Sequence, residues 1–181
     1  AASYLERALA AHRTSGPERT RAVTALGVTL TLRGEYERAD VLGREAAAAA
    51  AADGDKEARL ATVYMTGLLA LLTGRPREAL STVEEALAAA PGFAFDSASR
   101  LRCHLVKVFA LTALGEVADA HTLALGLREH CALTDEVWTR SYLDYQLSLI
   151  ALSRAAPGEA AHHARLMLRG KQDLGDTFGT A

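Results

Sequence analysis

The sequence is poor in the residues that mark several classes of protein. Its 181 residues include two cysteines and four prolines, and only 6% are aromatic. Two cysteines cannot form a disulfide framework, and such scarcity is typical of a reducing compartment, so we expect a cytoplasmic protein. A formal net charge of −2 and a pI near 6.3 leave no global basic surface, so we expect no direct contact with nucleic acid.

Long apolar runs and catalytic motifs are missing as well. No uninterrupted apolar stretch approaches about 18 residues, and the N-terminus lacks the layout of a signal peptide, so we expect no membrane association. The sequence has no glycine-rich phosphate loop, no His-Glu-x-x-His and no Gly-x-Ser-x-Gly. We therefore expect a protein that is not an enzyme, with no catalytic residues and no cofactor.

What the sequence does contain is one short pattern that appears four times. Its turn residue falls at steps of 40, 41 and 40 residues, and an alanine follows each turn five residues later. The turn residues are Gly34, Gly74, Gly115 and Ala155, and the alanines are Ala39, Ala79, Ala120 and Ala160. Self-similarity at this period, with much alanine, indicates stacked helical hairpins. The sequence predicts an all-α fold, a right-handed superhelix of antiparallel helical hairpins.

We expect a single array over residues 1–181, cut from a longer protein. The helix over 2–13 has no partner before it and is expected to be half of an interrupted hairpin, and 176–181 begins a further repeat. Four hairpins lie between them, over about 17–52, 55–90, 96–131 and 135–173. An excised array usually lacks its capping repeats, so we expect self-association of copies end to end.

Aspartates recur with the same period. Asp55, Asp96, Asp135 and Asp176 each stand at the entrance of an expected first helix, 41, 39 and 41 residues apart. A carboxylate at that place accepts the unpaired N–H groups of the first helical turn. This second series is independent of the turn residues and supports the same array.

Small residues stand where the two helices of a hairpin are expected to cross. Bulky side chains at a crossing would push the helix axes beyond the usual ~8–10 Å. We therefore expect Gly27 to face Ala39, and Gly67 to face Ala79, within their own hairpins.

These residues resemble the tetratricopeptide repeat. The first repeat follows the pattern of that family most closely, at Leu26, Gly27, Leu30, Gly34, Tyr36, Ala39 and Ala46, and the second at Gly67, Gly74, Ala79, Ala86 and Pro91. The steps of 40 and 41 residues are longer than the period of about 34 that is usual in the family.

Longer helices of this kind resemble the arrays of MalT-like, LuxR-type transcription activators, which also carry an ATPase module and a C-terminal helix-turn-helix. Residues 168–181 resemble a phrase that opens a late repeat in these regulators, and the Ala/Arg/Thr/Gly-rich composition is typical of an actinobacterial source. The resemblance implies a regulatory or sensor array that binds an effector or partner and contacts the other domains of its parent. The alternative is a free-standing scaffold for protein–protein interaction.

Four residues offer the ligand types of a zinc site: Cys103 and His104, with His130 and Cys131. Adjacent residues on a helix point about 100° apart, so both members of a pair cannot easily face one ion. We therefore expect buried thiols with surface histidines, and no metal site. The two histidines at 162–163 are expected on solvated helix surface.

The groove is the better candidate for a binding site. The tetratricopeptide resemblance implies a concave surface lined by first helices. Counting back from each turn gives the candidate groove residues Arg21, Thr24, Tyr64, Arg102, Phe109, Thr112, Tyr142 and Tyr145, together with Thr31, Leu68 and Leu149. Arginines bind carboxylates and tyrosines offer contact area with a polar tip, so the expected ligand is a protein, a peptide or a small-molecule effector. Alternatively, several of these side chains fill the seams between hairpins.

Overall fold

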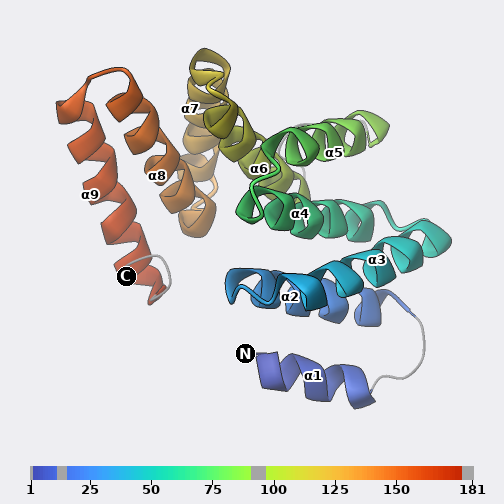
Figure 1. Ribbon diagram of the computed structural model, residues 1–181. Coiled ribbons are helices and arrows are strands. Elements are labelled where there is room, and N and C mark those ends of the chain that lie inside the picture. Colours follow the sequence, from blue (N-terminus) through green and yellow to red (C-terminus); the bar gives the residue numbers. More distant parts are fainter. Residues whose placement is uncertain (1, 12–15, 91–96, 177–181) are drawn as a thin grey trace. The chain divides into compact units, whose positions relative to one another are not determined.

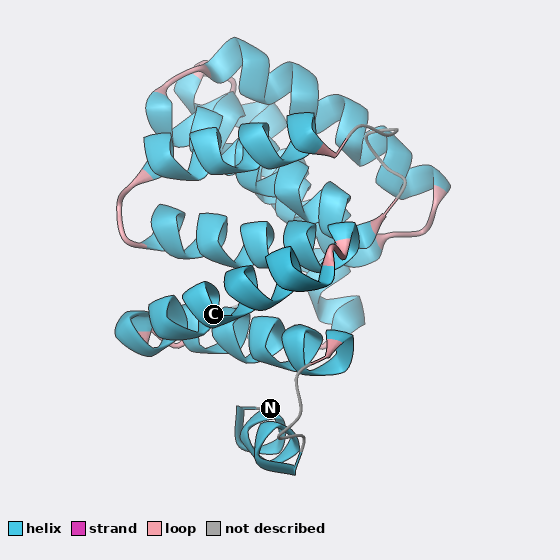
Figure 2. Ribbon diagram, turned by 90° about the vertical axis from the view of Figure 1, so that its right-hand side faces the viewer, coloured by secondary structure: helices cyan, strands magenta, loops and turns pink. Residues whose placement is uncertain are grey.

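Helices account for all the regular secondary structure that the computed structural model describes, which covers residues 2–11, 16–90 and 97–176. Short loops form the connections that lie within these residues, and no helix among them is long and apolar enough to cross a membrane (Figure 2). The helices are α1 (Ala2–Ala11), α2 (Pro17–Leu32), α3 (Tyr36–Asp53), α4 (Lys56–Leu72), α5 (Pro76–Ala89), α6 (Ala98–Leu114), α7 (Val117–Leu133), α8 (Val137–Ser153) and α9 (Pro157–Leu174) (Figure 1). The predicted all-α hairpin fold is confirmed.

The chain divides into two compact units, and the boundary falls inside α6. Unit 1 is Ala1–Val106 and unit 2 is Lys107–Ala181. In unit 1, α2 packs on α1, α3 and α4, and α4 packs on α3 and α5. In unit 2, α8 packs on both α7 and α9. Whether residues 1–181 are one array cut from a longer protein stays a prediction.

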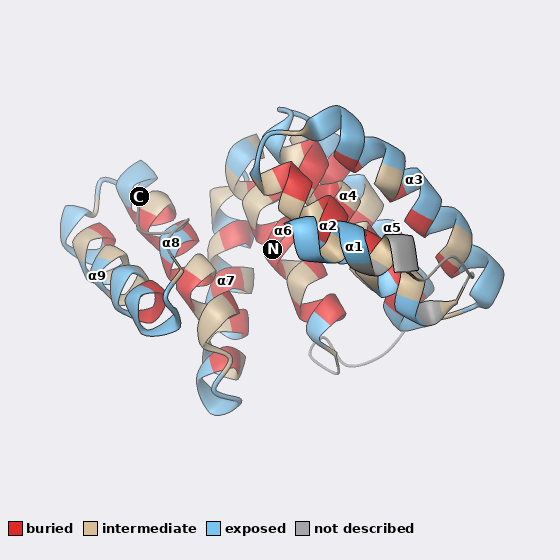
Figure 3. Cartoon of the chain, turned by 90° about the horizontal axis from the view of Figure 1, so that it is seen from below, coloured by how far each residue is buried: buried red, intermediate tan, exposed pale blue. Residues whose placement is uncertain are grey.

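The core of unit 1 lies between its hairpins. Leu26 and Leu30 of α2 pack with Ala39 of α3 and Leu69 of α4. In Figure 3, α4 is buried along much of its length, whereas α3 exposes most of its surface and buries only small residues. The alanine run of α3 therefore lets a mostly solvated helix lie close to its neighbours without adding bulk.

The predicted turn residues are confirmed by their backbone conformation. The φ angles are 78° at Gly34, 75° at Gly74, 81° at Gly115 and 57° at Ala155. After each turn the next backbone N–H donates to the carbonyl five residues earlier, as Glu35 does to Leu30 at 2.9 Å. This is the bond pattern that closes a helix through a left-handed residue. Ala155 adopts this conformation at a steric cost that glycine avoids.

The aspartate series is only partly confirmed. Asp55 caps α4, because its Oδ1 accepts from the N–H groups of Glu57 and Ala58 at 2.9 and 3.1 Å. Asp135 does not cap α8: with φ 54° it occupies the left-handed position that ends α7, and Glu136 precedes the helix. Asp96 lies outside the described residues, and so does the helix that Asp176 was expected to begin.

The close approach at Gly27 differs from the prediction. A Cβ atom at Gly27 would lie 2.0 Å from Sδ of Met65, so the side chain closest to this glycine belongs to the first helix of the next hairpin. Likewise, a Cβ atom at Gly67 would lie 3.0 Å from Cγ1 of Val106 on α6 and 3.4 Å from Cγ1 of Val83 on α5. The glycines admit side chains of the neighbouring helix, whereas Ala39 packs in the core cluster.

Candidate functional site

The first helix of the last hairpin, α8, carries a row of aromatic rings on one face. We call Phe109 of α6 and Trp138, Tyr142 and Tyr145 of α8 the aromatic stripe. The ring centroids of Trp138 and Tyr142 are 4.7 Å apart, and those of Phe109 and Tyr145 are 6.1 Å apart. Tyr145 is 38% exposed and Leu152, farther along the same face, is 58% exposed. Three of the candidate groove residues are therefore brought together in unit 2.

Tyr142 is held in place by the end of α9. Lys171, itself only 2% exposed, places Nζ 3.1 Å from the centroid of the Tyr142 ring and 2.8 Å from Oδ2 of Asp176. The Tyr142 hydroxyl donates to the same Oδ2 at 3.4 Å. Burial, followed by the nearby Asp176 charge, raises the pKa of Tyr142 to about 12, and burial lowers the pKa of Lys171. The phenol therefore stays neutral, and its polar tip is already used inside the fold.

The candidate groove residues of unit 1 differ widely in accessibility. Arg21 is exposed, but Thr24 is buried and its hydroxyl donates to the Thr20 carbonyl at 2.8 Å. Tyr64 is 8% exposed, with the Arg102 guanidinium 5.9 Å from its ring centroid. Thr24 and Tyr64 thus fill the interior of unit 1, where the prediction had them line an open surface.

The remaining candidate groove residues are buried or half-buried. Thr112, in unit 2, is half-buried, and its hydroxyl donates to the Val108 carbonyl of its own helix at 2.9 Å. Thr31 is fully buried and donates to the Gly27 carbonyl at 2.8 Å. Leu68 and Leu149 are half-buried. The threonine hydroxyl groups among the candidates are used by their own helices, so the exposed Arg21 of unit 1 and the aromatic rings of unit 2 are the candidates left to meet a ligand.

Both cysteines are core residues, as predicted, and the described residues hold no cluster of metal-ligand type. The Cys103 thiol donates to the Leu60 carbonyl at 3.3 Å, and burial raises its pKa to about 12. Burial also raises the pKa of Cys131, to about 11. The expectation of surface histidines beside them is wrong, since His104 and His130 are both half-buried.

A buried carboxylate on α8 was missed at the sequence level. Oδ1 of Asp144 accepts from Nε of Arg128 on α7 at 2.6 Å, and Nδ1 of His163 on α9 lies 2.8 Å from the same oxygen. The Asp144 side chain is 3% exposed and that of His163 is 18% exposed, so His163 is not solvated surface as expected. The sequence held a clue to this pairing, because Asp144 lies between the apolar residues Leu143 and Leu147 of the same helix. An aspartate that is buried among such residues is almost always paired.

Comparison with solved structures identifies the fold. The structure of a kinesin light chain-like protein from Podosopora anserina, with nearly identical TPR-like repeats, is 20% identical, covering 97% of this chain and 87% of that one with a TM-score of 0.62. A second structure of this protein gives 20% identity, coverages of 96% and 86%, and a TM-score of 0.60. This chain has a tetratricopeptide-like repeat fold. No family model matches its sequence, and no curated protein does.

Proposed function

We propose that this tetratricopeptide-like chain is a non-catalytic binding module that takes a protein or peptide partner on the aromatic stripe. The observation that carries the proposal is the pairing of three rings on one face of α8 with each other and with Phe109 of α6, with Tyr145 38% exposed. Aromatic side chains that combine exposure with a fixed position are typical of the residues that dominate the energy of protein interfaces.

The surroundings of the stripe favour binding over chemistry. Tyr142 is fixed by Lys171 and Asp176, so its ring loses little conformational entropy when a partner covers it. The neighbouring Leu152 extends the apolar area beyond the rings. A partner segment with apolar or aromatic side chains fits this face, because the hydroxyl groups of Thr112 and Tyr142 are already bonded within the protein.

The stripe contains its own reporter, because Trp138 is the only tryptophan of the sequence. Peptides selected from a random display library against the whole chain would be titrated while the emission of Trp138 is followed. We expect binding to shift this emission, and Tyr145→Ala to weaken binding by ~10-fold or more. Arg102→Ala, in unit 1, tests whether that half of the candidate groove takes part.

Leu133→Ala is the matched control, since Leu133 is 82% exposed at the end of α7 and lies outside the stripe. This variant should bind like the unchanged chain. Peptides that bind without changing Trp138 emission, and that are insensitive to Tyr145→Ala, would show that the binding face lies elsewhere.

For the setting of this module, we propose a regulatory or sensor array of a LuxR-type, MalT-like transcription regulator that responds to an effector or partner. Support comes from the 40- and 41-residue steps and from the phrase at 168–181. The alternative is a free-standing scaffold. The gene that encodes the chain separates the two: an ATPase module before the array and a helix-turn-helix after it support the regulator, and a gene lacking both refutes it.

A further inference from the structure

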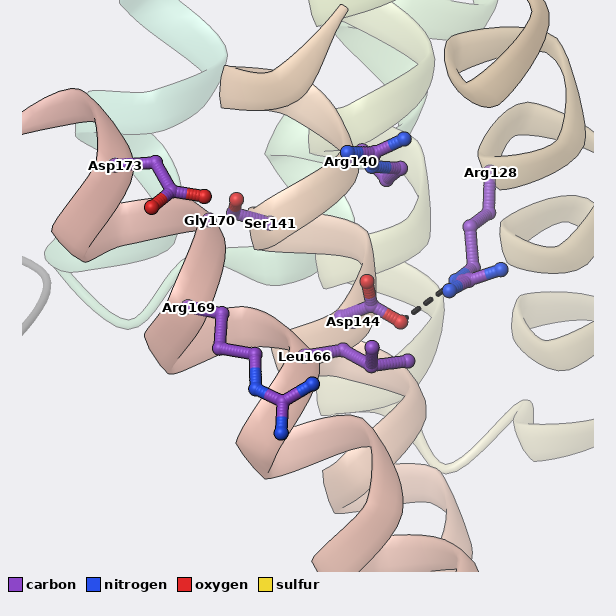
Figure 4. A pocket seen from close by; sticks show the side chains of 8 residues that line it. All are labelled: Arg128, Arg140, Ser141, Asp144, Leu166, Arg169, Gly170 and Asp173. Atoms are coloured by element: carbon purple, nitrogen blue, oxygen red, sulfur yellow. Dashed lines mark hydrogen bonds and ion pairs between the residues drawn. The ribbon is translucent and has the colours of Figure 1, made fainter.

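A polar pocket lies between α7, α8 and α9, on a different side of α8 from the aromatic stripe. At about 100° per residue, the mean direction of Arg140, Ser141 and Asp144 lies about a third of a turn away from that of Tyr142 and Tyr145. The pocket has a volume of about 310 Å³, which is near the lower end for small-molecule sites. Figure 4 shows its lining residues, Arg128, Arg140, Ser141, Asp144, Leu166, Arg169, Gly170 and Asp173.

The charges around this pocket do not balance. Three arginines, one from each helix, face two aspartates, which leaves one positive charge in excess. Asp144 is already engaged by Arg128 and His163, so its negative charge is largely satisfied. Within the described residues, Arg140 and Arg169 have no ion pair and no side-chain hydrogen bond. The excess therefore lies on guanidinium groups that have no acceptor of their own.

The guanidinium groups also keep N–H donors that no group of the described residues accepts. Arg128 uses Nε for Asp144 at 2.6 Å, while its two terminal nitrogens have no acceptor among the described residues. Since Asp144 is 3% exposed and anchored to two helices, it fixes the orientation of that guanidinium. The Ser141 hydroxyl donates to the Val137 carbonyl at 2.8 Å and so is committed to its helix. The recognition groups left are guanidinium N–H donors.

We propose that this pocket binds a small oxyanion, a carboxylate or phosphate group of a small molecule, through Arg128, Arg140 and Arg169. The planar guanidinium fork matches the oxygens of both groups and holds them with charge-assisted hydrogen bonds. Asp173, at the rim, opposes the charge of the ligand and limits affinity. The pocket and the aromatic stripe use different residues, so this site does not depend on the proposed partner surface.

Calorimetric titration of the whole chain with inorganic phosphate, and separately with citrate, tests the proposal and separates the two ligand chemistries. Ionic strength is held constant with sodium chloride. We expect saturable binding in at least one arm, weakened roughly 10- to 100-fold by Arg140→Gln or Arg169→Gln. Both arginines are unpaired among the described residues, so their loss should leave the thermal midpoint unchanged.

Two further variants distinguish a built site from general charge attraction. Arg165→Gln removes an exposed arginine of α9 that does not line the pocket, and it should leave affinity unchanged. Asp173→Asn should tighten binding severalfold, because it removes a negative charge from the rim. No binding in either arm, equal weakening by Arg165→Gln and Arg169→Gln, or weaker binding by Asp173→Asn overturns the proposal. Tyr145→Ala should leave anion binding intact.

Discussion

The contact between α8 and α9 depends on the absence of one side chain, at Gly170. A Cβ atom there would lie 2.1 Å from Oγ of Ser141, but 3.4 Å from its Cβ and 3.6 Å from Cγ1 of Val137. Only the hydroxyl stands in the way, since the other two distances are ordinary contacts. Gly170→Ala should therefore destabilise unit 2 through this one atom.

The magnitude follows from two opposing effects. Replacing glycine by alanine inside a helix normally stabilises by about 0.5–1 kcal/mol. Overpacking a tight contact costs about 1–3 kcal/mol, because the hydroxyl must leave its bond to the Val137 carbonyl or the helices must separate. We expect a net loss of about 1–2 kcal/mol for Gly170→Ala, and a change of less than about 1 kcal/mol for Ser141→Ala.

The double variant decides whether the reasoning is correct. With both substitutions the obstructing oxygen is gone, so the double variant should recover at least the stability of the original chain. The coupling free energy should be about 1.5–3 kcal/mol, which is the overpacking cost that Ser141→Ala relieves. The assay is urea unfolding followed by emission of Trp138, which lies on α8 in unit 2 and so reports the local transition.

Gly126→Ala provides the control, because Gly126 is an exposed residue of α7 and a Cβ atom there would meet nothing within 4 Å. This variant should gain about 0.5–1 kcal/mol. If Gly170→Ala stabilises as much as Gly126→Ala, or if the coupling free energy is zero, the close approach of α8 and α9 at this point is refuted.

Three other perturbations give results of known sign. Ala155→Gly should stabilise by about 1 kcal/mol in the same assay, because glycine adopts the φ of 57° without steric cost; a loss of stability would contradict the left-handed turn. Asp55→Ala should cost about 1 kcal/mol by thermal unfolding while Asp55→Asn retains most of the cap, and equal losses would contradict capping. Burial raises the pKa of Cys103 from its ordinary value of 9.0 to about 12, so its thiol favours the folded state fully below pH 9 and loses that contribution as pH rises to about 12. Urea titrations should show this fall, which Cys103→Ala should reduce, and at pH 8 a thiol reagent should label Cys103 only as fast as the protein opens.

Local backbone chemistry made the helices and turns predictable. The turn residues follow from steric rules that act on single positions, and even Ala155 was placed correctly because its repeat spacing fixed it. Asp135 shows what the repeat spacing alone cannot predict, because the same period fits a residue that begins a helix and a residue that ends the helix before it. Its φ of 54° is set by the end of α7, with the Glu136 N–H bonded to the Cys131 carbonyl at 2.9 Å.

Contacts between helices were harder to predict than the helices themselves. Gly27 was recognised as a close-approach residue, but its partner is Met65 on the next first helix, and no sequence spacing within one hairpin encodes that pairing. Thr24 and Tyr64 were predicted on an open face because counting residues along a helix gives the direction in which a side chain points. The count does not show whether a neighbouring helix covers that side chain, and both are buried. Tyr145, counted to the same face by the same rule, is 38% exposed, and whether it contacts a ligand stays a prediction.

Two surfaces of different chemistry both include residues of α8 in unit 2. The stripe offers aromatic rings, and the hydroxyl group of Tyr142 is already bonded to Asp176. The pocket instead offers guanidinium donors around the buried carboxylate of Asp144. An anion bound between Arg140 of α8 and Arg169 of α9 would hold those two helices together. Because Lys171 of α9 also fixes the Tyr142 ring, such an anion would tighten the same pair of helices that positions part of the stripe. Any coupling between the two sites must then act in both directions, so a peptide bound on the stripe would change anion affinity by the factor by which the anion changes peptide affinity.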